Sequence, residues 1–424
     1  MLFFSAISLT ILTFLGFFVE YKNKSPFVIF FLALLLMSVF PTIIVAFGIE
    51  SLNYKKEVYL EATLFSCLYL LSFIFFRILF VNLLGVKNVW RNFISNKEKI
   101  LKSDIFLFLF LMLMCLVAFL KGLNINSIQA AFSLNWWDLV HGNSIVLLGT
   151  YLSYMSCGLL LLNYLYKGDL IIKRFTYGVV LFFLLFAVFI LKTRSYVLMI
   201  LIPLFVYFFF TKKGVELIKP LIFLVGMLFL FVLARAVRHS FDLNEFLEGD
   251  IKESLTGASE DAESTFINAF FYFVSKGNDF VGFEQNLTLK RILFFWFPEV
   301  KPIDFSYYMH SAYYGSSPSE GLSMHPTVYG DAYGNAWWFG AFLYSIFLSL
   351  YISVLEVFIK LIKYKKMVLS LAIFSIISTS ALIFARGAIY NAFMFSFLPV
   401  FLFFIFYLVM DIFSKKDKSF KVGG

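Results

Sequence analysis

The sequence contains few charged residues for its length, because Asp, Glu, Lys and Arg make up only 14% of 424 residues while 61% are hydrophobic. A soluble globular domain with this composition could not cover its surface with polar side chains. The scarcity of charge therefore excludes a soluble enzyme. It predicts an all-α, polytopic integral membrane protein.

Cysteine and histidine are also scarce, with three and four residues. Cys67, Cys115 and Cys157 fall in separate apolar runs, which indicates neither a disulfide framework nor metal-ligand spacing. The sequence shows no Asp-x-Asp pattern and no His and carboxylate cluster typical of a metal site. We expect no metal and no other cofactor.

A cleaved secretion signal is not indicated at the N-terminus. No basic residue precedes the first apolar run, and no small-x-small pattern lies near Glu20. We interpret this run as the first membrane span.

Long apolar runs are abundant, and each is close to the length that crosses about 30 Å of hydrocarbon. We predict about eleven, at residues 2–19, 27–48, 58–80, 105–120, 144–166, 176–191, 196–210, 220–237, 337–362, 367–385 and 393–413. The predicted organisation is spans 1–8 in residues 1–237, one large polar loop in 238–336, spans 9–11 in 337–413 and a basic tail in 414–424.

Lysine and arginine set the expected orientation. They gather in loops after odd-numbered spans, for example at Lys87 and Arg91, and in the tail. The positive-inside rule makes those loops cytoplasmic, so the loop of residues 238–336 and the N-terminus face outward. The net charge of +9 is then a topology and anionic-lipid signal and does not predict binding to nucleic acid.

Two segments of the large loop have apolar residues at helical spacing. The first set is Ile267, Phe270, Phe271 and Val274, and the second is Leu289, Ile292, Leu293 and Trp296. Neither is long enough to cross a membrane. We predict two helices at the outer membrane boundary, the second carrying Lys290 and Arg291 toward the headgroups.

Four arginines form a candidate anion site at the outward ends of spans, namely Arg194, Arg235, Arg238 and Arg386. The guanidinium fork suits bidentate binding of phosphate oxygens. For any one of them, snorkelling to the interface or pairing with an acidic residue of the loop explains its position equally well.

His325 is the leading candidate for proton transfer, because an imidazole of ordinary pKa near ~6.5 accepts a proton at neutral pH. A His before Pro can equally be a turn residue. Tyr329, Asp331 and Tyr333 are close enough in sequence to orient it or to bind a hydroxylated ligand. His310 is the rival base, although the tyrosines around it favour a stacking surface for sugar rings, and Arg291 is a further candidate for substrate contact.

At these residues the chain resembles the O-antigen polymerases, the Wzy-type oligosaccharide repeat unit polymerases of bacteria. The resemblance rests on the many spans with one large late loop and on three short motifs. They are Lys192-Thr193-Arg194-Ser195, Pro298-Glu299-Val300-Lys301-Pro302 and His325-Pro326-Thr327-x-x-Gly330-Asp331-x-x-Gly334-Asn335.

The resemblance implies a glycosyltransferase of the bacterial inner membrane with a periplasmic loop, whose donor and acceptor are undecaprenyl-diphosphate-linked oligosaccharides. In this interpretation His325 is the base for the acceptor hydroxyl and the four arginines bind the departing diphosphate. No nucleotide sugar or metal takes part, and displacement inverts the anomeric carbon. A chain-length-regulating co-polymerase is a candidate partner.

Two alternatives stay open. An O-antigen ligase or another lipid-linked glycan transferase would use the same chemistry with a different acceptor. A flippase would perform no chemistry, but a transporter of this size should show repeated halves and ionisable groups at mid-membrane. We find no internal repeat, and for the main intramembrane charges, Glu61 and Arg77, we favour a buried pairing with neighbouring spans.

Overall fold

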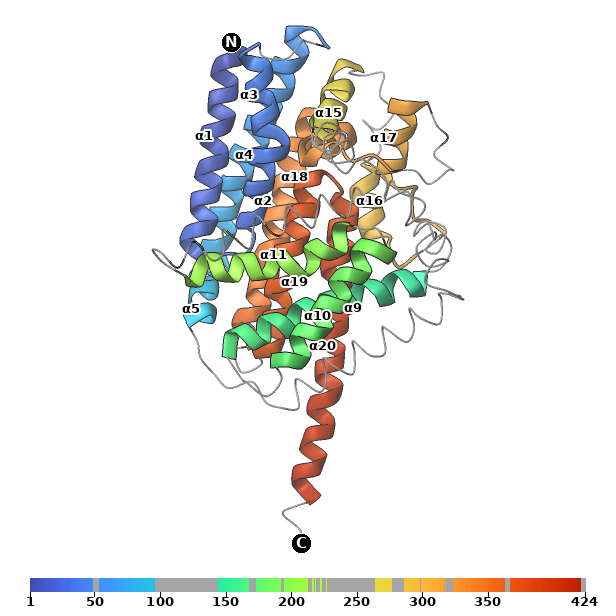
Figure 1. The fold of residues 1–424 in the computed structure, drawn as a ribbon. Coiled ribbons are helices and arrows are strands. Elements are labelled where there is room, and N and C mark those ends of the chain that lie inside the picture. The colour runs from blue at the N-terminus through green and yellow to red at the C-terminus, as the bar shows by residue number, and fades with distance from the viewer. Residues whose placement is uncertain are drawn as a thin grey trace, which may run out of the picture. The chain divides into compact units, whose positions relative to one another are not determined.

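In the computed structural model, all regular elements among the described residues are helices (Figure 1). The described residues are 1–48, 53–95, 144–167, 173–191, 194–212, 264–276, 286–297, 299–315, 323–362 and 367–420, and the single residues 216, 218, 222, 226 and 317.

The chain forms two compact units, each assembled from separated stretches. The first comprises residues 1–92, 260–363 and 380–396, and the second comprises residues 93–259, 364–379 and 397–424.

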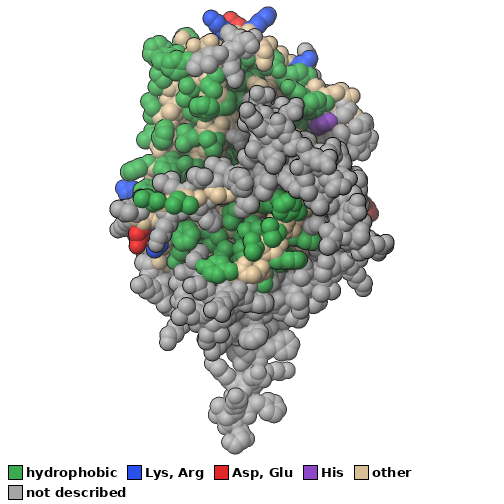
Figure 2. Space-filling view, in the orientation of Figure 1, with side chains coloured by type: hydrophobic (Ala, Val, Ile, Leu, Met, Phe, Trp, Pro, Cys, Tyr) green, Lys and Arg blue, Asp and Glu red, His purple; other side chains and the backbone are tan. Residues whose placement is uncertain are grey.

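The first unit is built on long apolar helices. They are α1 (Leu2–Asn23), the run of α2 (Val28–Leu34), η1 (Leu35–Val39) and α3 (Phe40–Ala46), α4 (Lys56–Leu83) and α18 (Thr327–Ile362). Helix α4 packs against both α1 and α18. Hydrophobic side chains cover much of the visible surface over α1–α4 (Figure 2), as expected of helices that face lipid.

Helix α18 is interrupted at Ala336 and Trp337, whose backbone angles are not helical, with φ of +50° at Trp337. A Cβ atom placed on Gly340 would lie 2.0 Å from the carbonyl oxygen of Ala332. Residues eight apart in a straight helix are more than two turns apart. The chain therefore reverses at the interruption, which lies where the sequence predicts the ninth span to begin.

The segment before the reversal runs antiparallel to α4. The Tyr333 ring lies 5.1 Å from that of Phe65, and the Tyr329 ring lies 5.5 Å from that of Tyr69, further along α4. The long segment after the reversal runs parallel to α4, because Ser349 bonds to the Phe73 carbonyl and later residues lie further along α4.

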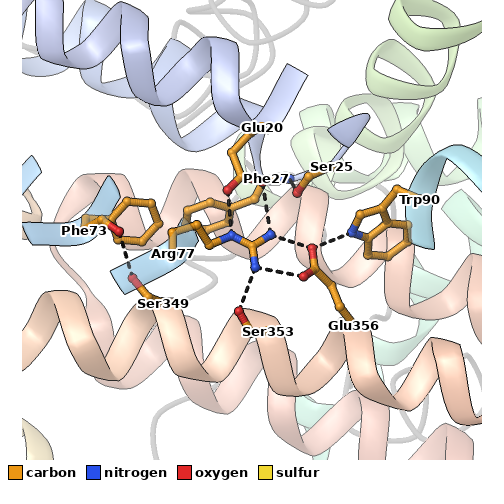
Figure 3. A network of polar contacts seen from close by, with 9 residues as sticks. All are labelled: Glu20, Ser25, Phe27, Phe73, Arg77, Trp90, Ser349, Ser353 and Glu356. Atoms are coloured by element: carbon orange, nitrogen blue, oxygen red, sulfur yellow. Dashed lines mark hydrogen bonds and ion pairs between the residues drawn. The ribbon is translucent and has the colours of Figure 1, made fainter. Parts of the chain in front are cut away.

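A buried ion cluster joins the C-terminal parts of α1, α4 and α18 (Figure 3). Arg77 binds the carboxylates of Glu20 and Glu356, and its guanidinium also donates to Ser353 at 2.8 Å. The indole of Trp90 donates to Glu356 at 2.8 Å. Arg77 is 1% exposed, so the predicted pairing of this intramembrane charge with neighbouring spans is confirmed.

Three shorter helices come from the predicted loop: α15 (Ser264–Lys276), α16 (Leu287–Leu293) and α17 (Phe305–Tyr314). The predicted apolar stripe of α15 is confirmed, because Ile267, Phe270, Phe271 and Val274 are all buried. This helix packs against α4 and α18. In the second predicted helix Ile292 is buried, whereas Leu293 is exposed and Trp296 lies beyond the helix end.

The second unit contains α9 (Ser144–Lys167), α10 (Lys173–Leu185) with η3 (Phe186–Ile190), and α11 (Arg194–Thr211). Helix α9 packs against α10 and α11. Gly158 permits the second contact, since a Cβ atom there would lie 3.0 Å from the carbonyl oxygen of Met199.

Three helices are shared between the units: α5 (Val89–Ser95), α19 (Met367–Arg386) and α20 (Ile389–Phe420). Helix α20 continues into the stretch predicted as a basic tail. Within the described residues, five helices are long and apolar enough to cross a membrane: Leu2–Asn23, Val28–Ala46, Lys56–Leu83, Thr327–Leu361 and Leu369–Arg386.

Candidate functional site

The candidate site lies where the start of α18 meets the turn between α19 and α20. Gly387 in this turn has φ of +90°, and a Cβ atom on it would lie 2.1 Å from the carbonyl oxygen of Thr327. Only glycine permits this approach. The turn, and with it Arg386, is therefore held directly against the residues that follow His325.

A second tight contact shapes the segment that carries His325. A Cβ atom on Gly330 would lie 2.7 Å from the Cβ of Pro326. The backbone N–H of Met324 donates to the Ser306 carbonyl of α17 at 3.1 Å. The His-Pro segment is thus fixed both to its own helix and to the first turn of α17.

Asp331 joins three helices through its carboxylate. Its Oδ1 accepts hydrogen bonds from the Thr288 hydroxyl at 3.0 Å and from the Asn335 amide at 2.8 Å, and its Oδ2 accepts from the Ile389 N–H at 3.1 Å. Asn335 also accepts from the Thr288 N–H at 3.1 Å. Both carboxylate oxygens are therefore engaged in holding α16 and α20 on α18.

Asp304 organises the neighbouring helix α17. It caps that helix by accepting bonds from the Ser306 N–H at 3.0 Å and hydroxyl at 2.7 Å, as N-terminal Asp residues commonly do. Its other oxygen lies 3.4 Å from Nε of Arg291. The Arg291 guanidinium also donates to the Pro302 carbonyl and lies 4.5 Å from the centre of the Tyr390 ring.

These groups surround a small polar pocket. Its lining consists of Thr288, Asp304, Ser306, Asp331, Gly387, Ala388, Ile389, Tyr390 and Asn391. Hydroxyl, carboxylate and amide groups beside one aromatic ring line it, and its enclosed space is about that of one water molecule.

His325 lies at the edge of this arrangement and is only 7% exposed. Its Nδ1 has no hydrogen-bond partner among the described residues. Burial, and then the charge of Arg386, lowers the pKa of His325 well below its ordinary value. The imidazole is therefore neutral at neutral pH, and it holds a proton less firmly than the ordinary pKa expected from the sequence implies.

The arginines predicted as an anion site fall in different places. Arg386 ends α19, is exposed, and lies near enough to His325 for its charge to act there. Arg194 is the first residue of α11 in the second unit. Arg235 and Arg238 lie outside the described residues.

The remaining candidates have other partners or none. The Tyr333 hydroxyl donates to Glu61 and accepts from the Trp337 indole, each at 3.0 Å. The buried Tyr329 hydroxyl has no partner among the described residues. His310 lies on α17 with its ring 4.7 Å from that of Tyr314.

Sequence reasoning missed Thr288, Asp304 and Tyr390. Asp304 was detectable, since Asp before an aromatic run with Ser two residues later is a helix-start pattern. Thr288 and Tyr390 had no such signal, because they join the site only through contacts between distant segments.

No group of three or more His, Cys, Asp or Glu side chains among the described residues is placed to hold a metal ion. The chain matches no protein-family model, no curated protein and no solved structure.

Proposed function

We propose that this protein is a membrane glycosyltransferase that polymerises oligosaccharide repeat units carried on undecaprenyl diphosphate. One observation carries the proposal: a buried, neutral imidazole with an unpaired Nδ1 lies within the electrostatic reach of an exposed arginine. A base and a cation are the two groups that transfer from a diphosphate donor needs.

In the proposed reaction the acceptor sugar hydroxyl attacks the anomeric carbon of the donor glycan. The new glycosidic C–O bond forms as the bond to the carrier diphosphate breaks, with inversion at that carbon. His325 Nδ1 takes the hydroxyl proton, and the diphosphate leaves with the bonding electron pair. Arg386 offsets its growing negative charge.

The low proton affinity of His325 fits such a reaction. A base of depressed pKa removes a hydroxyl proton poorly unless the proton becomes acidic late in bond formation. A diphosphate is a good leaving group, so the bond to the diphosphate breaks ahead of attack by the acceptor hydroxyl. The base is therefore needed only late, when the hydroxyl proton has become acidic.

The other candidates take supporting roles. Asp331 is engaged through both oxygens, so we assign it to positioning the α19–α20 turn. Arg291 is bound to Asp304 and stacked on Tyr390, so we assign it to the pocket wall. Arg194, Arg235 and Arg238 remain proposed contacts of the diphosphate.

The proposal places the protein in the bacterial inner membrane with the site open to the periplasmic side. The apolar helices support a membrane location. The sidedness follows from the distribution of Lys and Arg in the sequence.

The test is deletion of the gene in its own bacterium, with wild-type, His325→Ala and Arg386→Ala alleles returned. We expect the deletion and both variants to lose the surface-polysaccharide ladder and keep one repeat unit on lipid A core. His310→Ala is the matched control, and it should retain the ladder.

Other outcomes would identify the alternatives. Polymer that accumulates on its lipid carrier would indicate a ligase, and single units trapped on the cytoplasmic leaflet would indicate a flippase. Full ladders from both His325→Ala and Arg386→Ala would remove the assigned roles.

A further inference from the structure

The residues at the end of α16 and just after it expose large apolar side chains. Leu293 is 71% exposed, Trp296 56% and Phe297 59%. The opposite side of α16 is packed into the protein, with Leu287 and Ile292 each 7% exposed. Residues 293–297 therefore present a one-sided apolar surface in a segment that the sequence places in a polar loop.

Ring contacts give the level of this segment along the first unit. The Phe295 ring lies 6.2 Å from the Phe393 ring on α20, and Phe393 lies 5.2 Å from Tyr351 on α18. Two residues before Tyr351, the Ser349 hydroxyl donates to the Phe73 carbonyl on α4 at 3.3 Å. Phe295 is thus linked, ring to ring, to the part of α18 beside Phe73.

That part of α4 lies deep in the membrane span. The apolar run of residues 58–80 is about 34 Å long at 1.5 Å per residue, close to the roughly 30 Å of the hydrocarbon core. Phe73 lies only about 6 Å beyond Tyr69, the midpoint of the run. Leu71 and Phe75, on either side of it, are 56% and 60% exposed, which is expected of side chains that face acyl chains.

The chain turns back beyond this point. Phe297 donates its N–H to the Phe294 carbonyl, and Lys301 donates to the Phe297 carbonyl at 3.1 Å. The Pro302 carbonyl accepts a bond from Arg291 on α16, so the returning segment is level with that helix again. The segment enters and leaves on the same side.

We infer that residues 293–297 form a re-entrant wedge whose exposed side chains contact the acyl chains of the bilayer. These exposed side chains lie at the same depth in the bilayer as the exposed residues of α4. Its basic residues suit the same placement. Arg291 and Lys301 lie 4.5 and 5.3 Å from the Tyr390 ring.

Glu299 limits the depth of the wedge. It is exposed, and a carboxylate in hydrocarbon is costly. Because the chain is already turning back at this residue, we place Leu293 to Phe297 among acyl chains and Glu299 on the returning limb, before the bond from Lys301 to Phe297 closes the turn.

The test uses spin labels in reconstituted bilayers, on a background with the three native cysteines replaced by alanine. Labels at Leu293→Cys and Phe297→Cys are compared with Phe75→Cys as the lipid reference and Lys55→Cys as the water reference. We expect both wedge labels to collide with oxygen several-fold more than with a water-soluble nickel chelate, as the Phe75 label does. Nickel accessibility equal to that of the Lys55 label would overturn the inference, and so would shielding from both reagents.

A second measurement uses tryptophan fluorescence of the protein with its native cysteines retained. Lipids brominated on their acyl chains quench the fluorescence of tryptophans that touch them. We expect Trp296→Phe to lose a measurable share of this quenching relative to wild type. Equal quenching of the two proteins would contradict lipid contact at Trp296, and neither result depends on the proposed polymerase activity.

Discussion

At the scale of single residues, the candidate site separates polar atoms that are paired from polar atoms that are not. Asp331 has three donors on two oxygens, which is what a buried carboxylate needs to remain in place. His325 Nδ1 and the Tyr329 hydroxyl have no partner among the described residues. A buried polar atom without a partner carries a cost, and such atoms concentrate where a ligand or water supplies the missing bond.

Stability should depend on pH through His325. Burial and Arg386 lower its folded-state pKa, so the unfolded chain, with a pKa near ~6.5, binds more protons between the two values. Stability is then complete above about pH 6.5 and falls by about 1.4 kcal/mol per pH unit below it. Thermal unfolding of the detergent-solubilised protein should show this slope, and His325→Gln should flatten it. An unchanged slope in the variant would assign the effect to another group.

The hydroxyl of Thr288 should matter more than its methyl group. The hydroxyl donates to Asp331 and accepts from Asn335, each at 3.0 Å, at a site 2% exposed. Thr288→Val keeps the shape but leaves both partners short of a bond, which we expect to cost about 1–3 kcal/mol. Thr288→Ser keeps the bonds and should cost less. Equal loss of thermal stability in the two variants would show that packing, not bonding, holds α16 on α18.

At the scale of elements, part of the fold was predictable because apolar residues at helical spacing lie on one face of a helix, and that face is the one that packs. The stripe of α15 was identified correctly since its four residues face one neighbour pair, α4 and α18. The stripe assigned to α16 was only partly right, because the helix ends at Leu293 and its next turn faces away from the protein. Local spacing does not reveal which apolar face meets protein and which meets lipid.

The largest difference between the sequence prediction and the structure lies at the start of α18. The sequence predicted a polar loop up to residue 336, but the structure begins the helix at Thr327 and uses Gly330, a residue type that also occurs in turns, for contact with Pro326. The same ambiguity affects Gly387. A glycine that permits a turn and a glycine that permits close packing are indistinguishable until the partner segment is known.

Gly387→Ala should disrupt the junction of α18 with the α19–α20 turn. The added Cβ would meet Thr327 backbone at 2.1 Å in a residue with φ of +90°. Gly315→Ala is the matched control, since Gly315 also has positive φ, +72°, but nothing lies within 4 Å of the added Cβ. The control should cost about 1 kcal/mol for conformation alone. Gly387→Ala should lower thermal stability clearly more than the control does, and it should also weaken polymer formation. Equal loss of stability in the two variants would show that the contact with Thr327 is unimportant.

At the scale of the whole molecule, the chain combines sparse charge with two fully buried ion pairs among the described residues, Arg77 with Glu20 and Arg77 with Glu356. The two units draw on stretches far apart in sequence, so contacts between distant segments decide which helices assemble. In the first unit Arg77 provides such a contact, since its partners Glu20 and Glu356 are 57 and 279 residues away. The sequence indicated that Arg77 is paired but could not identify both carboxylates, because Glu20 lies near the end of its apolar run.

All five N–H donors of Arg77 are used: two bind Glu20, two bind Glu356 and one binds Ser353. Arg77→Met would leave two carboxylates buried without a cation, which we expect to cost about 3–5 kcal/mol. Arg77→Lys should recover little, because an ammonium lacks the planar fork that reaches both partners. Arg91→Met is the control on an exposed arginine that donates to the Lys22 carbonyl at 3.3 Å, and it should leave thermal unfolding nearly unchanged.

The decisive variant combines Arg77→Met with Glu20→Gln and Glu356→Gln. If the destabilisation of Arg77→Met comes from uncompensated charge, removing both charges should restore much of the unfolding temperature even though every ionic contact is gone. If the cluster instead acts through its hydrogen bonds and shape, the triple variant should be no more stable than the single one. Recovery in the triple variant would mean that ionisation of the carboxylates is what makes the arginine indispensable. A buried cation would then be required by its neighbours and would add little net stability of its own.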